Sequence, residues 1–209
     1  MPVPPRHALP HAPKDAVIGL FGGSFDPAHE GHVQVSRHAL KRLQLRQLWW
    51  LVSPGNPLKA HGPAALERRV AYARALMQHP QVQITSVEAV LGTRFTADTL
   101  VALQRLYPRQ RFVWIMGADN LASLHHWESW HRIMRSVPVA VMARPGQCRP
   151  ALSSVAARSY AAARIPAEAA AHLGQMRAPA WCFLNIPMLD TSSSKLRELG
   201  AWRGIDAAV

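Results

Sequence analysis

Short apolar runs alternate along the chain with stretches in which apolar residues recur every three or four positions. The second kind is clear where Val35, Ala39 and Leu43 follow one another at the spacing of one helix face. The runs expected to form buried strands are residues 16–21, 47–52, 82–87, 111–116, 137–143 and 181–188. The stretches expected to form helices are residues 31–43, 66–76, 95–107, 127–136 and 192–202. This alternation predicts an α/β fold with a parallel sheet.

The order of these elements predicts a single doubly wound domain. A helix between successive strands returns the chain to the same edge of the sheet, so the strands run parallel and helices cover the faces. Ligands of such folds bind at the carboxyl ends of the strands, near the point where the strand order reverses. We therefore expect functional residues in the loops that follow the strands. Residues 144–180 are rich in alanine and arginine without a clear period, so no element is assigned to them.

The composition fits one domain with a short leader. The chain has 209 residues, of which 49% are hydrophobic, and this is enough for one core. Residues 1–14 are rich in proline and lack the apolar stretch of a signal peptide, so we expect a flexible leader before a domain at 15–209. No apolar run is long enough to span a membrane. Cys148 and Cys182 are too few for a disulfide framework, which favours the cytoplasm.

A net charge of +12 raises the alternative of a nucleic-acid-binding protein. The basic residues are dispersed along the chain and are not interleaved with aromatic residues along one element. No RNA-recognition or zinc-finger signature occurs. Solvated helix faces or the attraction of small phosphorylated anions explain the charge as well, so a nucleic-acid partner is the weaker hypothesis.

The stretch GGSFDPAHEGH, residues 22–32, directly follows the first expected strand. Gly22 and Gly23 have no side chains, so backbone N–H groups can approach a phosphate closely, and the next helix presents its N-terminus to the same anion. The stretch has no dinucleotide fingerprint, no Walker loop and not the histidine spacing of a zinc protease. His29 and His32 lie one turn apart, so both can donate N–H groups to one ligand. A surface or capping role is the alternative for either histidine.

A run of serines precedes the last expected helix. Ser192, Ser193 and Ser194 can cap its free N–H groups and leave hydroxyl donors for a phosphate. Arg197 follows one turn later and can reach the same anion with a fork of charge-assisted hydrogen bonds. An ordinary capped helix with a surface arginine is the alternative for this stretch taken alone.

Together the two motifs resemble the signatures of the nucleotidylyltransferase superfamily. GGSFDPAHEGH resembles [ST]FDPxHxGH, and TSSSKLR resembles ISSTxIR with Thr191 in place of isoleucine and Ser194 in place of threonine. Other stretches resemble nicotinate-nucleotide adenylyltransferases: SPGNPLK with Lys59, RFTADTL with Thr96, WIMGADNLASLHHW with Gly117, Asp119 and Trp127, and ARPG with Arg144. The resemblance extends from Ala16 to about Arg203 and implies a Rossmann-like sheet.

This resemblance implies adenylyl transfer from ATP to nicotinate mononucleotide, which yields deamido-NAD and pyrophosphate. The catalytic residues that it implies are His29, His32, Lys59 and Arg197. The ATP-binding residues that it implies are Gly22, Gly23, Ser24, Phe25, Gly117, Asp119, Thr191, Ser192, Ser193 and Ser194. The residues that it implies for the mononucleotide are Thr96, Trp127 and Arg144. Mg²⁺ is expected to arrive with ATP, held by phosphate oxygens and water, so no protein metal ligand is named.

Several alternatives stay open. Trp127 can stack on a pyridine ring, but core packing also explains a tryptophan there. Asp119 can bind ribose hydroxyls or cap a helix. A superfamily relative that uses nicotinamide mononucleotide or phosphopantetheine would share both phosphate motifs, and a ligand-binding regulator would keep the fold without the catalysis. No feature of the sequence fixes the oligomeric state.

Overall fold

The structure, a computed structural model, describes residues 8–55, 62–143, 148–187, 193–198 and 202. Its strands are β1 (Val17–Gly23), β2 (Gln47–Val52), β3 (Val82–Thr85), β4 (Arg111–Gly117), β5 (Val139–Ala143), β6 (Arg164–Ile165) and β7 (Trp181–Asn185). Its α-helices are α1 (Glu30–Arg42), α2 (Leu66–Leu76), α3 (Val87–Leu91), α4 (Thr96–Leu106), α5 (Ala118–Ser123), α6 (Trp130–Ser136), α7 (Cys148–Leu152), α8 (Val155–Ser159) and α9 (Ser193–Glu198). Its 3₁₀ helices are η2 (Leu124–His126), η3 (Ala161–Ala163) and η4 (Ala167–Gln175).

The strands of the described residues form one sheet in the order β3-β2-β1-β4-β5-β7-β6, and every paired strand is parallel to its neighbour. The chain winds from β1 outward to β3 and then returns to β4 on the other side of β1. The order therefore reverses between β1 and β4, where the loops that follow these two strands diverge and leave a crevice. The expected α/β fold with a doubly wound parallel sheet is confirmed.

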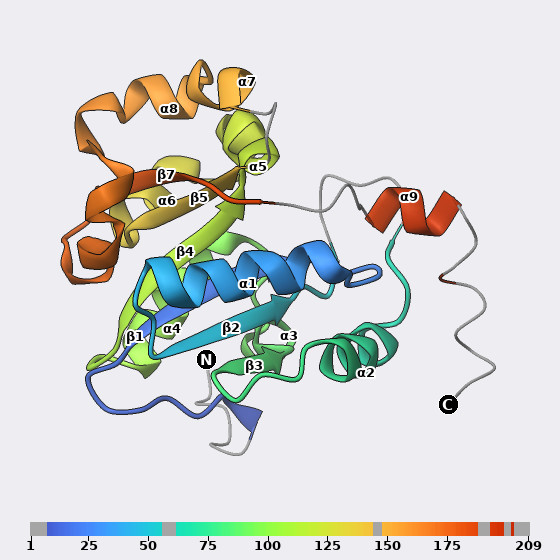
Figure 1. The fold of residues 1–209 in the computed structure, drawn as a ribbon. Coiled ribbons are helices and arrows are strands. Elements are labelled where there is room, and N and C mark those ends of the chain that lie inside the picture. Colours follow the sequence, from blue (N-terminus) through green and yellow to red (C-terminus); the bar gives the residue numbers. More distant parts are fainter. Residues whose placement is uncertain (1–7, 56–61, 144–147, 188–192, 199–201, 203–209) are drawn as a thin grey trace.

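Helices cover both faces of the sheet (Figure 1). One core cluster joins alternate strand residues, among them Leu20 and Trp49, to the helices α3 to α8. The other cluster joins the intervening residues, among them Trp50 and Ile115, to α1, α2 and η4. Neighbouring residues of a strand point to opposite faces, so a strand covered on both sides is apolar throughout. This is why β2 appears in the sequence as the unbroken run QLWWLV.

The differences from the sequence-based expectations fall in short elements. The strand expected at 82–87 ends at Thr85, because the chain turns at Ser86 into the five-residue helix α3. The six-residue helix α5 follows β4 where none was expected, and the helix expected at 127–136 begins at Trp130. Residues 144–180, left without an element, include α7, α8, β6 and η4. Helices of fewer than two turns have no repeating apolar face from which the sequence could reveal them.

Residues 8–13 lie against the sheet domain. Leu9 and Ala12 pack on the first core cluster, and the Tyr107 hydroxyl donates to the Pro10 carbonyl at 2.7 Å. Residues 1–7 lie outside the described part of the chain, so the flexible leader at 1–14 and the domain at 15–209 remain predictions. In the part of the chain that the structure describes, no helix has the length and apolarity needed to cross a membrane.

Candidate functional site

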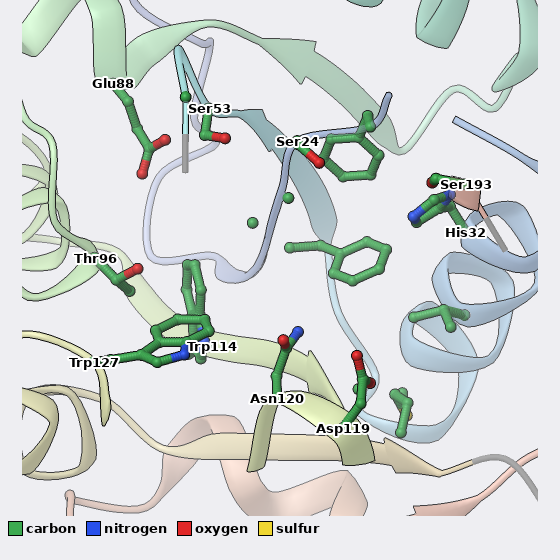
Figure 2. Close-up of a pocket in the computed structure, with 18 of the residues that line it drawn as sticks. Ser24, His32, Ser53, Glu88, Thr96, Trp114, Asp119, Asn120, Trp127 and Ser193 are labelled. Atoms are coloured by element: carbon green, nitrogen blue, oxygen red, sulfur yellow. The ribbon is translucent and has the colours of Figure 1, made fainter. Parts of the chain in front are cut away.

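A cavity of about 490 Å³ lies near the carboxyl ends of β1, β4 and β5 (Figure 2). Its position is the crevice where the strand order reverses. Eleven of the residues expected at the site line this cavity: Gly22, Gly23, Ser24, Phe25, His29, His32, Thr96, Gly117, Asp119, Trp127 and Ser193. Stretches that lie far apart in the sequence therefore meet around one space.

The two imidazoles sit at the N-terminus of α1 and are held by its backbone. His29 is the N-cap residue, and its Nδ1 accepts the Gly31 N–H at 3.1 Å. His32 reaches back, and its Nδ1 accepts the His29 N–H at 3.1 Å. An imidazole whose Nδ1 accepts a hydrogen bond carries its proton on Nε2. The capping of α1 thus gives each ring an Nε2–H donor, and both histidines line the cavity. The sequence left capping and a position at the ligand site as alternatives for each histidine, and in the structure both histidines cap α1 and also line the cavity.

The His32 ring packs against the aromatic side chains of Phe25 and Trp50. The Phe25 ring stacks on Trp50 with centroids 4.7 Å apart, and the centroid of His32 lies 4.9 Å from that of Phe25. The Trp50 indole donates to the Ser36 hydroxyl at 2.7 Å, which locks it against α1. Phe25 has a φ of 46°, a left-handed conformation that costs a non-glycine residue about 1–2 kcal/mol. The buried stack on Trp50 holds this strained backbone where the chain turns past the cavity.

Two glycines that line the cavity are needed because other groups occupy the space of a side chain. A Cβ on Gly22 would lie 2.3 Å from Cη2 of the Trp114 ring. A Cβ on Gly117 would lie 2.3 Å from Oδ1 of Asp119. Gly22 is the second-last residue of β1 and Gly117 the last residue of β4, so the absence of a side chain brings an indole and a carboxylate directly against the backbone at the crevice.

The serine-led helix α9 is attached to the N-terminal motif. The Ser193 hydroxyl donates to the Pro27 carbonyl at 2.8 Å, and Ser193 itself lines the cavity. The Arg197 guanidinium donates to the Asp26 carbonyl and to the Ser194 hydroxyl, the latter at 3.1 Å. Arg197 does not line the cavity, but it lies against the loop that does. The two motifs that the sequence grouped by resemblance are therefore in contact.

Asp26 joins these segments. Its carboxylate is 3.8 Å from the Arg197 guanidinium and accepts the Trp202 indole N–H at 2.9 Å, while its exposure is 7%. Trp202 in turn packs under the Arg68 guanidinium, whose carbon is 4.3 Å from the ring centroid. Asp26 belongs to the quoted FDP motif, but the sequence gave it no role because its partners lie more than 170 positions away.

Arg69 on α2 fixes the loops on the other side of the cavity. Its side chain is fully buried, and it donates to the carbonyls of Ala64, Ser24 and Ser53 at 2.7, 2.6 and 2.8 Å. Burial lowers the pKa of the guanidinium, and the charge of Asp26 opposes that shift. Ser24 and Ser53 follow β1 and β2, so one arginine sets the positions of two strand exits. The sequence signal for it is an arginine on the apolar face of α2, three residues after Leu66.

The other end of the cavity has a different chemistry. Thr96 begins α4, and Trp127 is partly buried, so that it both lines the cavity and packs against the first core cluster. The core packing of Trp127 is therefore confirmed, while its stacking on a pyridine ring stays a prediction. Asp119 lies in the first turn of α5 with an exposed side chain and is directed to the cavity rather than to a cap hydrogen bond. In Figure 2, Thr96 and Trp127 lie at the opposite end of the cavity from His32 and Ser193.

Glu88 is a buried acid in the cavity wall that the sequence did not single out. Its exposure is 7%, and its Oε1 accepts the Thr99 hydroxyl at 3.2 Å. Burial raises the pKa of the carboxyl to about 7, and the Thr99 hydrogen bond opposes the shift. A carboxyl this deep in a wall carries its charge at a cost in folding free energy.

We expect Glu88→Gln to stabilise the protein at pH 8 and to have little effect at pH 5. Between pH 4.5 and about 7 the native carboxyl keeps a proton that the unfolded chain releases, so the free energy of unfolding falls as the pH rises. Glutamine keeps the acceptor for Thr99 and has no charge. Chemical denaturation should show a gain of up to about 3 kcal/mol at pH 8 that shrinks to below about 1 kcal/mol at pH 5. A gain that did not depend on pH would contradict the assignment.

Four of the expected site residues, Lys59, Arg144, Thr191 and Ser192, lie outside the described residues. Within the described ranges, no group of three or more histidine, cysteine or acidic side chains is arranged to hold a metal ion. The end of the cavity near His32 and Ser193 is lined by imidazole N–H groups and serine hydroxyls. These donors suit phosphate oxygens better than they suit Mg²⁺, which prefers oxygen ligands.

Comparison with known proteins identifies the family. Residues 20–199 match the cytidylyltransferase-like family. A protein of Ruegeria pomeroyi, described as a probable nicotinate-nucleotide adenylyltransferase, is 59% identical over 94% of this chain and 92% of its own length. A protein of Cereibacter sphaeroides with the same description is 61% identical over 90% of this chain and 100% of its own length. The chain belongs to the cytidylyltransferase-like family and, within it, to the nicotinate-nucleotide adenylyltransferases.

The fold is also similar to a solved structure. Plasmodium falciparum nicotinic acid mononucleotide adenylyltransferase, complexed with NaAD, superposes with a TM-score of 0.67 and covers 88% of this chain and 83% of that chain. The sequence identity is 16%, so this likeness concerns the fold alone. It confirms the Rossmann-like architecture that the sequence resemblance implied.

Proposed function

We propose that this protein transfers the adenylyl group of ATP to nicotinate mononucleotide and releases deamido-NAD and pyrophosphate, a step of NAD biosynthesis. The observation that carries this function is the cavity with two chemically different ends. His29 and His32 offer N–H donors at one end, beside the Ser193 hydroxyl that donates to the Pro27 carbonyl, and Thr96 and Trp127 form a flat, partly apolar wall at the other. A substrate with a phosphate at one end and an aromatic ring at the other fits this division.

The reaction needs no covalent enzyme intermediate. The 5′-phosphate of the mononucleotide attacks the α-phosphorus of ATP in line and forms a new P–O bond, while the bond to the pyrophosphate oxygen breaks. The attacking phosphate is already anionic at neutral pH, so no general base is required. What the protein supplies is positioning and stabilisation of charge.

The cavity lining supports the proposed roles of His29, His32 and Ser193. The Nε2–H of His32 would donate to the α-phosphoryl oxygens as negative charge shifts onto them. His29, Ser193 and Arg197 would hold the triphosphate and the leaving pyrophosphate, and we extend this role to Lys59, Thr191 and Ser192. Gly22 and Gly117 would contribute to ATP binding indirectly, because they leave room for the Trp114 ring and the Asp119 carboxylate in the cavity wall.

The metal ion and the location complete the proposal. Nucleotidyltransferases of this kind generally use a divalent cation with ATP, and we propose Mg²⁺, carried in by the phosphate oxygens and water as part of the substrate. We further propose that the protein works in the cytoplasm, because its two cysteines, Cys148 and Cys182, are too few for a disulfide framework. For Arg144, which follows β5, we propose a contact with the mononucleotide.

The experiment that tests this function measures pyrophosphate release by the purified chain from ATP and a mononucleotide. We expect one pyrophosphate for each deamido-NAD formed with nicotinate mononucleotide, and slower turnover with nicotinamide mononucleotide. Phosphopantetheine should give no release. Absence of turnover with nicotinate mononucleotide, or faster turnover with phosphopantetheine, would contradict the proposal.

We expect Trp127→Ala to raise the KM for nicotinate mononucleotide at least tenfold and to change the KM for ATP less than twofold. The indole would stack on the pyridine ring, and loss of an aromatic contact of this size costs about 1.5 kcal/mol or more. Trp127→Phe keeps a flat ring and should recover most of the loss. Steady-state kinetics with each substrate varied in turn measures both constants. An equal rise in the two KM values would assign Trp127 to core packing alone.

A further inference from the structure

Arg94 places a permanent positive charge at the aromatic end of the cavity. It is the one lysine or arginine among the described residues that line the cavity. The acidic side chains in the same lining are Glu88, Asp119 and Glu128. Among the described residues of the lining, Arg94 is therefore the one that offsets the charge of these carboxyl groups towards an anionic ligand.

The guanidinium of Arg94 is not used by the fold. Within the described residues it makes no hydrogen bond and no ion pair, and its side chain is exposed. Other arginines of the described chain are committed: Arg69 to carbonyls of two loops, and Arg132 to Asp98 at 3.3 Å. An arginine that stability does not require, in the wall of a cavity, is available to a ligand.

The backbone on both sides of Arg94 is held in place. The hydroxyls of Thr93 and Thr99 lie 2.9 Å apart, which ties the residue before Arg94 to α4. The carbonyl of Phe95, the residue after it, accepts the N–H groups of Asp98 and Thr99 at 3.0 and 3.1 Å. The Cα of Arg94 is therefore fixed at the cavity while its long side chain can turn towards a bound group.

Two further donors at this end lack a partner in the described residues. The N-cap residue of α4, Phe95, provides no side-chain cap for the first N–H groups of the helix, where the positive end of the helix dipole lies. The Nε1 of Trp114 is buried without a hydrogen-bond partner in the described residues, and Trp114 lines the cavity. An acceptor atom that reached either group would satisfy a donor that the described residues leave without a partner.

We propose that Arg94 is the residue that selects an acceptor with a ring carboxylate over one with a ring carboxamide. This inference rests on the proposed function and names the group that determines its acceptor. Arginine has only donors, in a planar fork that matches the two oxygens of a carboxylate. A carboxamide offers one oxygen and turns its own NH₂ donors towards the guanidinium, so it forms fewer and weaker hydrogen bonds.

The test compares kcat/KM for nicotinate mononucleotide and for nicotinamide mononucleotide in the parent, in Arg94→Gln and in Arg94→Glu. Arg105→Gln is the matched control, because Arg105 is exposed on α4, the helix that follows Arg94, and does not line the cavity. We expect Arg94→Gln to lower the preference for nicotinate mononucleotide about ten- to hundredfold, chiefly through its KM. Arg94→Glu should prefer the nicotinamide substrate. The KM for ATP should stay within twofold in all variants.

The outcomes separate the two proposals. If the parent turns over nicotinate mononucleotide and Arg94→Gln keeps the parental ratio of the two acceptors, the role of Arg94 is wrong while the proposed function stands. If the parent turns over neither mononucleotide, both proposals fail. An equal loss with both acceptors would make Arg94 a general binding residue and would also overturn its role in selection.

Discussion

Replacement of His32 by alanine is expected to lower kcat at least a hundredfold and to leave the protein folded. The structure gives His32 an Nε2–H donor in the cavity, fixed by the hydrogen bond that its Nδ1 accepts from the His29 N–H. Loss of a preorganised donor to a developing charge costs about 3 kcal/mol of transition-state stabilisation. Single-turnover formation of deamido-NAD from ATP and nicotinate mononucleotide measures the chemical step directly.

The capping role of His32 needs its own control. Alanine also removes the acceptor for the His29 N–H, which costs about 1 kcal/mol of stability. His32→Gln keeps an acceptor at this position of the helix, as in an ordinary capping box, but has no imidazole. We expect it to restore the melting temperature without restoring kcat. His38→Ala, further along α1 and outside the cavity, should change neither. A His32→Ala protein within twofold of the parent kcat would refute the role.

Replacement of Arg69 by alanine is expected to give the largest loss of stability of any change discussed, about 3–5 kcal/mol. Its guanidinium is fully buried and serves carbonyls of Ala64, Ser24, Ser53 and Pro54. Removal leaves these buried carbonyls without their donor and takes a positive charge away from the nearby Asp26 carboxylate. Thermal unfolding should report a fall of about 10 °C for a chain of this size.

Arg69→Lys and Arg74→Ala make this result specific. Lysine keeps the charge, but its single ammonium cannot match a planar fork that reaches several carbonyls, so we expect only partial recovery. Arg74 lies on the same helix α2, is exposed and makes one long hydrogen bond of 3.4 Å to the Ile84 carbonyl. Its replacement should cost less than about 1 kcal/mol. If Arg69→Ala unfolded at the temperature of Arg74→Ala, the loops around the cavity would not depend on this side chain.

The sequence predicted the sheet well because each strand and long helix carries its own signal. The run QLWWLV has the length and the apolar character of a strand covered on both faces, and β2 has those bounds. Short helices such as α3 and α5 carry no such signal. They form because the sheet and α4 already present a surface for residues such as Val87 and Leu121 to cover.

The candidate site was predictable where one short stretch holds the chemistry, as in residues 22–32. It was not predictable where the chemistry depends on residues far apart in the chain. Asp26 gains its importance from Arg197 and Trp202, and Glu88 gains its raised pKa from burial by the completed fold. The position of Arg69 on the apolar face of α2 marks it as buried, but its partners, the Ser24 and Ser53 carbonyls after β1 and β2, are set by the completed fold.

The most direct test of this account is a crystal structure of the protein with a non-hydrolysable ATP analogue. The account predicts that the triphosphate lies in the cavity between the end of β1 and the start of α9, with phosphate oxygens within hydrogen-bond distance of the His32 imidazole and the Ser193 hydroxyl. A triphosphate bound elsewhere, with His32 and Ser193 both remote from it, would contradict the account.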